Sequence, residues 1–219
     1  MRITLVPLLA AMLLVVAPLA GCEAKAPVAE EDADGIRAFA GGAYFGVVKV
    51  RVIPPEGSDA RPASRNGTGS AELQDSGRLV VVGDIDREAD AGFAADGAFA
   101  DGGWAGGSGG VELAIAADGA ITGGGTADGN AMSIEGRIDR RRLDLFFEIE
   151  LLADSAGGFP AGTRFQFRYD LWRPFKRPPD QEDGPTPPGG CREVVYRNKL
   201  VPNLSGGAMG MVRVPECRR

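Results

Sequence analysis

Acidic side chains are the residues of this chain whose type and spacing could carry chemistry. Asp144, Glu148 and Glu150 occur in the segment RRLDLFFEIELL, and glycoside hydrolases use two carboxylates about 5–9 Å apart. These acids alternate with apolar residues, so they share the polar face of one expected strand. Cross-strand ion pairs with Arg and Gln residues of the next expected strand are a simpler role for them. A carboxylate-dependent hydrolase is therefore the alternative to a non-catalytic domain.

The chain contains no histidine, which restricts the catalytic and metal-binding sites that it could form. Without histidine there can be no Ser-His-Asp or Cys-His catalytic arrangement. Zinc sites also lose their commonest nitrogen ligand. We therefore expect a protein that is not an enzyme and that holds no metal and no cofactor.

The segment DIDREAD spaces four acids two residues apart, as a calcium loop could. The pattern fails as an EF-hand because Ala89 stands where glycine is required and Ala95 where the closing glutamate is required. A solvated turn after the apolar residues Val80–Val82 is the preferred interpretation.

A cysteine ends the apolar N-terminal stretch. Residues 5–19 are apolar and follow Arg2, and the stretch closes with Leu19-Ala20-Gly21-Cys22. This ending resembles the lipobox of bacterial lipoproteins. The resemblance implies that residues 1–21 are a cleaved signal peptide and that Cys22 carries a diacylglycerol and an acylated amino terminus. The stretch is short for a membrane span, which needs roughly 20 residues.

The lipobox also implies a location. Lipid chains on Cys22 would anchor the protein to a membrane of the bacterial cell envelope. Glu23 replaces the aspartate that signals inner-membrane retention in enterobacterial lipoproteins, which favours the outer membrane, with the domain facing the periplasm or the cell surface. Residues 22–42 are expected to form a lipidated, flexible tether, with a short helical turn around residues 35–40.

Two cysteines remain if Cys22 is lipidated. Cys191 and Cys217 belong to a chain predicted to be exported. Because the compartment is oxidising, these two cysteines are expected to form a disulfide. The bond would close the C-terminal segment 191–217 as a hairpin.

Alternation of apolar and polar residues dominates the rest of the chain and predicts an all-β fold. The clearest cases are RRLDLFFEIELL and TRFQFRYDLW. Residues 43–219 form one domain, an antiparallel meander of about ten strands. The expected strands lie near 44–53, 67–74 and 78–84, in about five segments over 111–172, and near 193–201 and 209–215. The pattern resembles lipocalin or avidin meander barrels, and a two-sheet sandwich is the alternative.

Glycine and proline mark the expected loops. GGWAGGSGG at residues 102–110 is predicted to be a loop because of its glycines. Residues 173–190 contain too many prolines for a central strand and are predicted to be a loop or linker. Asp118-Gly119 and Asp128-Gly129 are typical hairpin turns.

The segment LWRPFKRPP joins aromatic and basic side chains beside prolines. Such side chains are frequent anchors of protein interfaces. The predicted binding residues are Trp172, Arg173, Phe175, Lys176 and Arg177. The competing interpretation is an aromatic plug that packs against the end of the sheet.

Composition and charge limit the partners. The formal net charge is −6, which excludes the strongly basic surface typical of nucleic-acid binding. The sequence predicts a membrane-anchored envelope lipoprotein whose non-catalytic domain binds a small apolar ligand or another envelope protein. A purely structural role is a further alternative. An apolar cavity in a barrel would favour the ligand, and a filled core with an exposed aromatic patch would favour the protein partner.

Overall fold

The protein is almost entirely β-strand. Its structure, a computed structural model, describes residues 35–39, 42–85, 89–108, 110–174, 191, 193–202 and 209–218. The elements, in chain order, are η2 (Gly35–Phe39, a 3-10 helix), β1 (Gly42–Ile53), β2 (Ala63–Leu73), β3 (Arg78–Ile85), β4 (Ala89–Ala100), β5 (Gly103–Ser108), β6 (Val111–Ile115), β7 (Ala120–Ala127), β8 (Asn130–Ile138), β9 (Arg142–Leu151), β10 (Arg164–Trp172), β11 (Glu193–Pro202) and β12 (Met209–Arg218).

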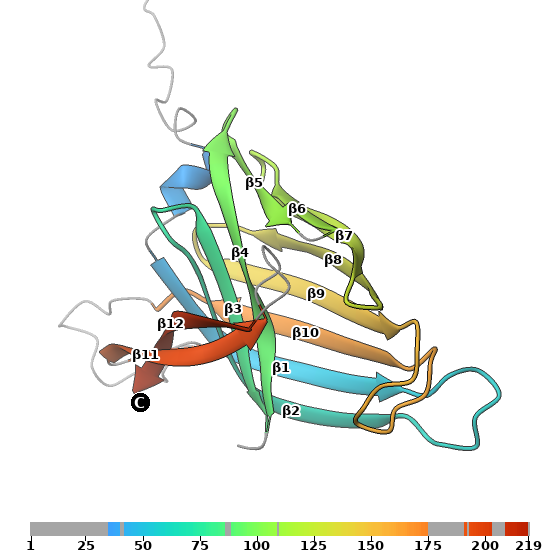
Figure 1. Ribbon diagram of the computed structural model, residues 1–219. Helices are drawn as coiled ribbons and strands as arrows, with labels where there is room; N and C mark the ends of the chain where they lie inside the picture. The colour runs from blue at the N-terminus through green and yellow to red at the C-terminus, as the bar shows by residue number, and fades with distance from the viewer. Residues whose placement is uncertain are drawn as a thin grey trace, which may run out of the picture. The chain divides into compact units, whose positions relative to one another are not determined.

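Strands β1 to β10 form a closed antiparallel barrel in which each strand pairs with the next in the chain (Figure 1). Closure comes from β1, which pairs with β2 on one side and with β10 on the other. The register of the closing pair runs from Phe45 opposite Trp172 to Ile53 opposite Arg164. A closed meander leaves no unpaired strand edge in this sheet. The predicted all-β fold and small barrel are confirmed, and the sandwich alternative is not.

The alternation in β9 decides which face of the sheet is the lumen. Leu143, Leu145 and Phe147 are almost fully buried and face inward, whereas Asp144 and Glu148 face outward. Because successive side chains point to opposite faces of a strand, one register places Leu143, Leu145 and Phe147 inside and leaves Phe146 outside among the polar residues. The barrel therefore has an apolar lumen, and the outer face of β9 is mostly polar.

Aromatic side chains fill this lumen. The ring of Phe147 lies between those of Phe93 and Phe167, with centroid distances of 5.2 and 5.6 Å. Tyr169 is fully buried, and its hydroxyl donates a hydrogen bond to the carbonyl of Ala91 at 3.3 Å. The surrounding side chains interdigitate as in an ordinary protein core.

Inward glycines make room for these large side chains. A Cβ atom added at Gly69 would lie 2.9 Å from Cδ2 of Leu171, and one added at Gly83 would lie 2.9 Å from Cγ1 of Val48. These positions have no open space in front of them. The lumen around them is a packed core rather than a ligand cavity.

The segment 102–110 is a correction to the sequence analysis. Residues Gly103–Ser108 are not a loop but strand β5, which pairs with both β4 and β6. Its Trp104 is buried, and Nε1 donates a hydrogen bond to the carbonyl of Gly77 at 2.8 Å. A Cβ atom at Gly97 would lie 2.5 Å from Cζ2 of Trp104, and Gly106 is in similarly close contact. The glycines are in a strand because the indole needs their space.

The C-terminal strands are a second difference. The sequence analysis counted them among the barrel strands, but β11 and β12 form a separate two-stranded sheet, and β4 and β5 complete the barrel instead. The hairpin lies across the outside of the barrel (Figure 1). Val201, Val212 and Val214 of the hairpin are buried with three small apolar side chains of the barrel wall, Val80, Val82 and Ala94.

The predicted disulfide is present in the hairpin. Cys191 and Cys217 are bonded, with their Cα atoms 5.3 Å apart. Cys217 is the register partner of Val194 on β11. The bond therefore ties the residue just before β11 to the end of β12.

The short helical turn predicted near residue 35 is η2. Its Ile36 is fully buried among the lumen residues, and the Ile36 amide donates a hydrogen bond to the carbonyl of Gly102 at 2.8 Å. Phe39 also packs against the lumen. Part of the segment 22–42 therefore belongs to the barrel core.

Candidate functional site

The carboxylates of β9 lie on the outer wall of the barrel. Arg142 bridges two of the acids there, with Nε 3.0 Å from Asp170 and Nη2 3.3 Å from Asp144. Gln166 donates a hydrogen bond to Glu148 at 2.6 Å across the strand pair. These contacts are the cross-strand pairs expected from the sequence. They hold the acids in hydrogen-bonded and ion-paired positions on a convex wall.

The predicted binding segment is described only in part. Trp172 is half-buried, with the guanidinium of Arg142 5.0 Å from its ring centroid. Arg173 points back to the barrel, where its guanidinium lies 5.0 Å from the ring centroid of Tyr44 and donates a hydrogen bond to the carbonyl of Phe39. Phe175, Lys176 and Arg177 lie outside the described residues. The two described members therefore make contacts within the barrel.

Arg173 also affects a neighbouring tyrosine. The Tyr44 hydroxyl donates a hydrogen bond to the carbonyl of Asp139 at 2.7 Å. Burial raises the pKa of Tyr44 to about 12, although the positive charge of Arg173 acts in the opposite direction. This hydroxyl therefore stays protonated at physiological pH and acts as a structural donor.

The outer face of the hairpin carries the largest exposed apolar side chains of its strands. Leu200 and Met211 are register partners and are 52% and 62% exposed, and Met209 is 59% exposed. Val194 and Tyr196 lie on the same face. We call these five residues the hairpin apolar face. The exposed side chains that share this face between the two strands are Val194, Tyr196, Asn198, Leu200, Pro202, Met209, Met211 and Arg213, and none of them is acidic.

Tyr196 connects this face to the barrel. Its hydroxyl donates a hydrogen bond to Oε1 of the buried Glu72 on β2, at 3.0 Å. The guanidinium of Arg213 lies 4.6 Å from the Tyr196 ring centroid. Desolvation raises the pKa of Tyr196, and the hydrogen bond to Glu72 raises it further. The neutral hydroxyl is therefore the donor that satisfies a buried carboxylate.

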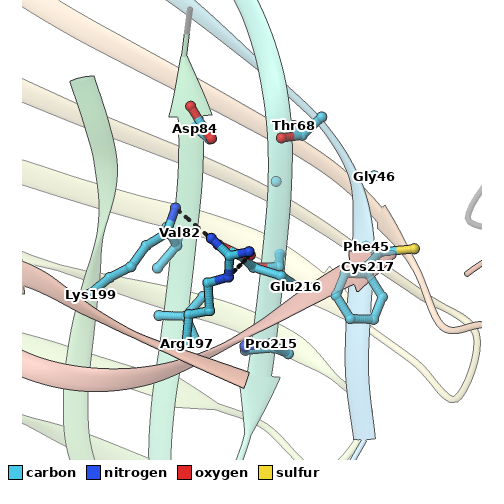
Figure 2. Close-up of a pocket in the computed structure, with 13 residues that line it drawn as sticks. Phe45, Gly46, Thr68, Val82, Asp84, Arg197, Lys199, Pro215, Glu216 and Cys217 are labelled. Carbon is cyan, nitrogen blue, oxygen red and sulfur yellow. Dashed lines mark ion pairs between the residues drawn. The ribbon is translucent and has the colours of Figure 1, made fainter. Parts of the chain in front are cut away.

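A pocket of about 290 Å³ lies where the hairpin meets the barrel wall (Figure 2). Its apolar part includes Phe45, Val82, Val214 and Pro215, all buried. The other residues that line it are Gly46, Thr68, Gly69, Ser70, Asp84, Arg197, Lys199, Glu216 and Cys217. The pocket thus combines an apolar base with charged groups of both signs.

The charged groups come from opposite sides of the pocket. On the hairpin, Glu216 accepts two cations, with Nε of Arg197 at 3.0 Å and Nζ of Lys199 at 3.7 Å. On the barrel, Asp84 of β3 stands next to Thr68, its register partner on β2. Figure 2 shows Asp84 apart from the three ion-paired residues.

The sequence analysis missed both the hairpin apolar face and the pocket. The segment VVYRNKLVP has apolar residues at both even and odd positions. Apolar residues on both faces predict a strand covered on both sides, and in the structure only one face is covered. That pattern was a usable signal for a second surface. No local sequence pattern predicts the pocket, because its residues come from segments more than 100 positions apart.

Comparison with protein-family models, with curated proteins and with solved structures finds no match to this chain. Within the described ranges, no helix is long and apolar enough to cross a membrane. Nor do those ranges contain a group of three or more His, Cys, Asp or Glu residues that could hold a metal ion.

Proposed function

We propose that this protein is a lipid-anchored protein of the bacterial cell envelope whose non-catalytic barrel domain binds another envelope protein. The observation that carries the proposal is the hairpin apolar face. It exposes five large apolar side chains on a domain whose lumen-facing side chains are buried against one another. A partner protein that covered this face would remove apolar surface from water, the main favourable term in protein association.

Two properties of the face suit a protein partner. Methionine side chains adapt to the shape of an opposing surface, and Met209 and Met211 are the two most exposed members. The face carries no acid in a chain of net charge −6. An approaching acidic protein would meet less repulsion here than at the acid-rich outer wall of β9.

The non-catalytic part of the proposal rests on the carboxylates. Two of the three candidate acids, Asp144 and Glu148, are engaged by Arg142 and Gln166 on the outer wall. Hydrolysis of a glycoside needs two carboxylates on either side of a substrate in a cleft. Asp144 and Glu148 instead project from one strand in the same direction.

The anchor and its location rest on the sequence alone. Leu19-Ala20-Gly21-Cys22 lies outside the described residues, and its resemblance to a lipobox supports lipidation of Cys22. Glu23 supports the outer membrane over the inner membrane. Lipid anchoring would hold the barrel at a membrane surface, where partners of the envelope are concentrated.

Crosslinking from the hairpin tests the partner. A photoreactive residue at Leu200 should give a discrete crosslinked protein band in intact cells, and the pair Met209→Ser with Met211→Ser should abolish the band. The same residue at Val47, which is 47% exposed on the barrel wall, is the matched control. Equal bands from both positions, or none from Leu200, would contradict the proposal, as would crosslinking to lipid alone.

Replacement of Cys22 by Ser tests the anchor separately. The variant should lose membrane association and migrate as an unprocessed or secreted form, because the thiol is the point of lipid attachment. Membrane fractionation with globomycin as a processing inhibitor checks this. A variant that stays membrane-bound and keeps the mobility of the processed wild type would contradict lipidation at this site.

A further inference from the structure

The pocket between the hairpin and the barrel has a charge arrangement that a simple docking surface does not need. Its residues come from β1, β2 and β3 on the barrel and from β11 and β12 on the hairpin. At about 290 Å³, it lies just below the usual range of ligand sites, about 300–1,000 Å³. A ligand as small as one amino acid would fit in it.

The hairpin side of the pocket carries two cationic side chains, Arg197 and Lys199. The carboxylate of Glu216 pairs with both of them. Lys199 is mostly buried, with 17% of its side chain exposed, whereas 64% of the Arg197 side chain is exposed. The guanidinium of Arg197 therefore has donors left over and can reach a carboxylate in the pocket.

The barrel side of the pocket has an acid, Asp84, that no described cation pairs with. Asp84 is exposed on β3 and makes no ion pair or hydrogen bond with any residue that the structure describes. The hydroxyl of Thr68 lies on the neighbouring strand at the same register position. A carboxylate beside a hydroxyl is suited to bind an ammonium group.

The apolar residues lie between these two charged sides. Phe45 is 5% exposed, Val82 2% and Val214 1%, so each is fixed by packing and presents only a small apolar surface to the pocket. An aliphatic group in the pocket would contact them without ordering any new protein side chain. Little conformational entropy would be lost on binding.

From these three features we propose that the pocket binds a free α-amino acid with an aliphatic side chain. The α-carboxylate pairs with Arg197, the α-ammonium pairs with Asp84 and Thr68, and the side chain packs on Phe45 and Val214. Among the described residues that line the pocket, two are acidic and two are basic, which suits a neutral zwitterion. This proposal is independent of the lipid anchor and of the partner on the hairpin apolar face.

Calorimetric titration of the purified protein with L-leucine tests the proposal. Three related compounds each remove one recognised group: isoamylamine lacks the carboxylate, 4-methylpentanoate lacks the amine and glycine lacks the side chain. Leucine should bind saturably, and each of the three compounds should bind at least tenfold more weakly. Saturable binding of 4-methylpentanoate equal to that of leucine would overturn the role of Asp84.

Substitutions then assign the site. Asp84→Asn and Arg197→Gln should each weaken leucine binding at least tenfold, and both residues are exposed enough for the fold to tolerate the change. Arg168→Gln is the matched control, because Arg168 is an exposed cation on the outer wall of β10 and does not line the pocket. Unchanged binding in Asp84→Asn, or no saturable binding of leucine by a wild-type protein with an intact melting transition, would overturn the proposal.

Discussion

The barrel lumen and the hairpin apolar face are both formed by apolar side chains of β-strands. The side chains of the lumen are buried, whereas those of the hairpin apolar face are exposed to solvent. In the lumen, the apolar side chains of ten strands converge and cover one another, so Phe147 and Tyr169 are nearly or fully buried. In the hairpin, one apolar face packs on the barrel, and no described residue covers Leu200, Met209 or Met211 on the other face. Leu200 and Met211 therefore stay exposed although they are as apolar as the lumen residues.

The difference shows that closure of the sheet into a barrel determines which faces and edges of a strand are covered. A strand in a closed sheet has both edges hydrogen-bonded and one face buried by the other strands of the same sheet. The β11–β12 sheet has two strands only, and such hairpins are marginal by themselves. It is held by valine packing, by the Tyr196–Glu72 hydrogen bond and by the disulfide. The barrel is thus the stable scaffold and the hairpin the part whose second face is available.

The largest expected effect comes from emptying the lumen. Phe147→Ala should lower the free energy of unfolding by about 3–5 kcal/mol, because the ring contacts Phe93 and Phe167 and leaves a cavity. Met211→Ala on the hairpin apolar face should change it by less than about 0.5 kcal/mol. Chemical denaturation of both variants checks the contrast. Similar losses of unfolding free energy in both variants would contradict the contrast between the buried lumen and the exposed hairpin apolar face.

Removing the disulfide should loosen the hairpin and spare the barrel. The bond joins residues separated by 26 positions, so its loss should cost about 3–4 kcal/mol in the chain-entropy model. Hydrogen exchange of the double variant Cys191→Ser with Cys217→Ser should show this cost in the amides of β11 and β12. If the lumen-facing strands β8 and β9 lost as much protection, the barrel would not be an independent scaffold.

Filling the space beside Trp104 should strain the barrel by a smaller amount. Gly97→Ala places a Cβ atom against the indole and should cost about 1–3 kcal/mol. Gly157→Ala is the control, since its Cβ atom would meet the Phe159 ring at an ordinary 3.7 Å. Thermal unfolding of both variants measures the difference. An unchanged melting temperature for Gly97→Ala would contradict tight packing at this end of the lumen.

The smallest effect concerns Tyr44 and depends on pH. Tyr44→Phe removes one hydrogen bond to Asp139 and should cost about 1 kcal/mol at pH 8. Tyr44 has a pKa of about 12 in the folded state against about 10 when unfolded. Its contribution is therefore fully present below pH 10 and is lost as the pH rises toward 12. Urea titrations at pH 8 and pH 11 should show the wild-type advantage shrinking, and an advantage that grows with pH would contradict the assignment.

The strands that could be predicted are those whose pattern is local. In β9 and β10 the period of two is visible in consecutive residues, so the residue pattern alone separates their apolar side from their polar side. Strand β5 could not be predicted, because its glycines are explained only by Trp104 and by Gly97 on the neighbouring strand. The disulfide could be predicted because only two cysteines remain once Cys22 is assigned to the proposed lipid anchor.

By itself the sequence determined the fold class, the strands with one apolar and one polar face, and the cysteine pair. Each of these depends on residue type and short spacing. Only the tertiary structure decided that the polar face of β9 is the outside of a barrel, because alternation is the same whichever way a sheet curls. Only the tertiary structure brought Asp84 opposite Arg197, since strands more than 100 residues apart meet there. It also left Leu200 and Met211 exposed, because exposure depends on what the rest of the chain covers.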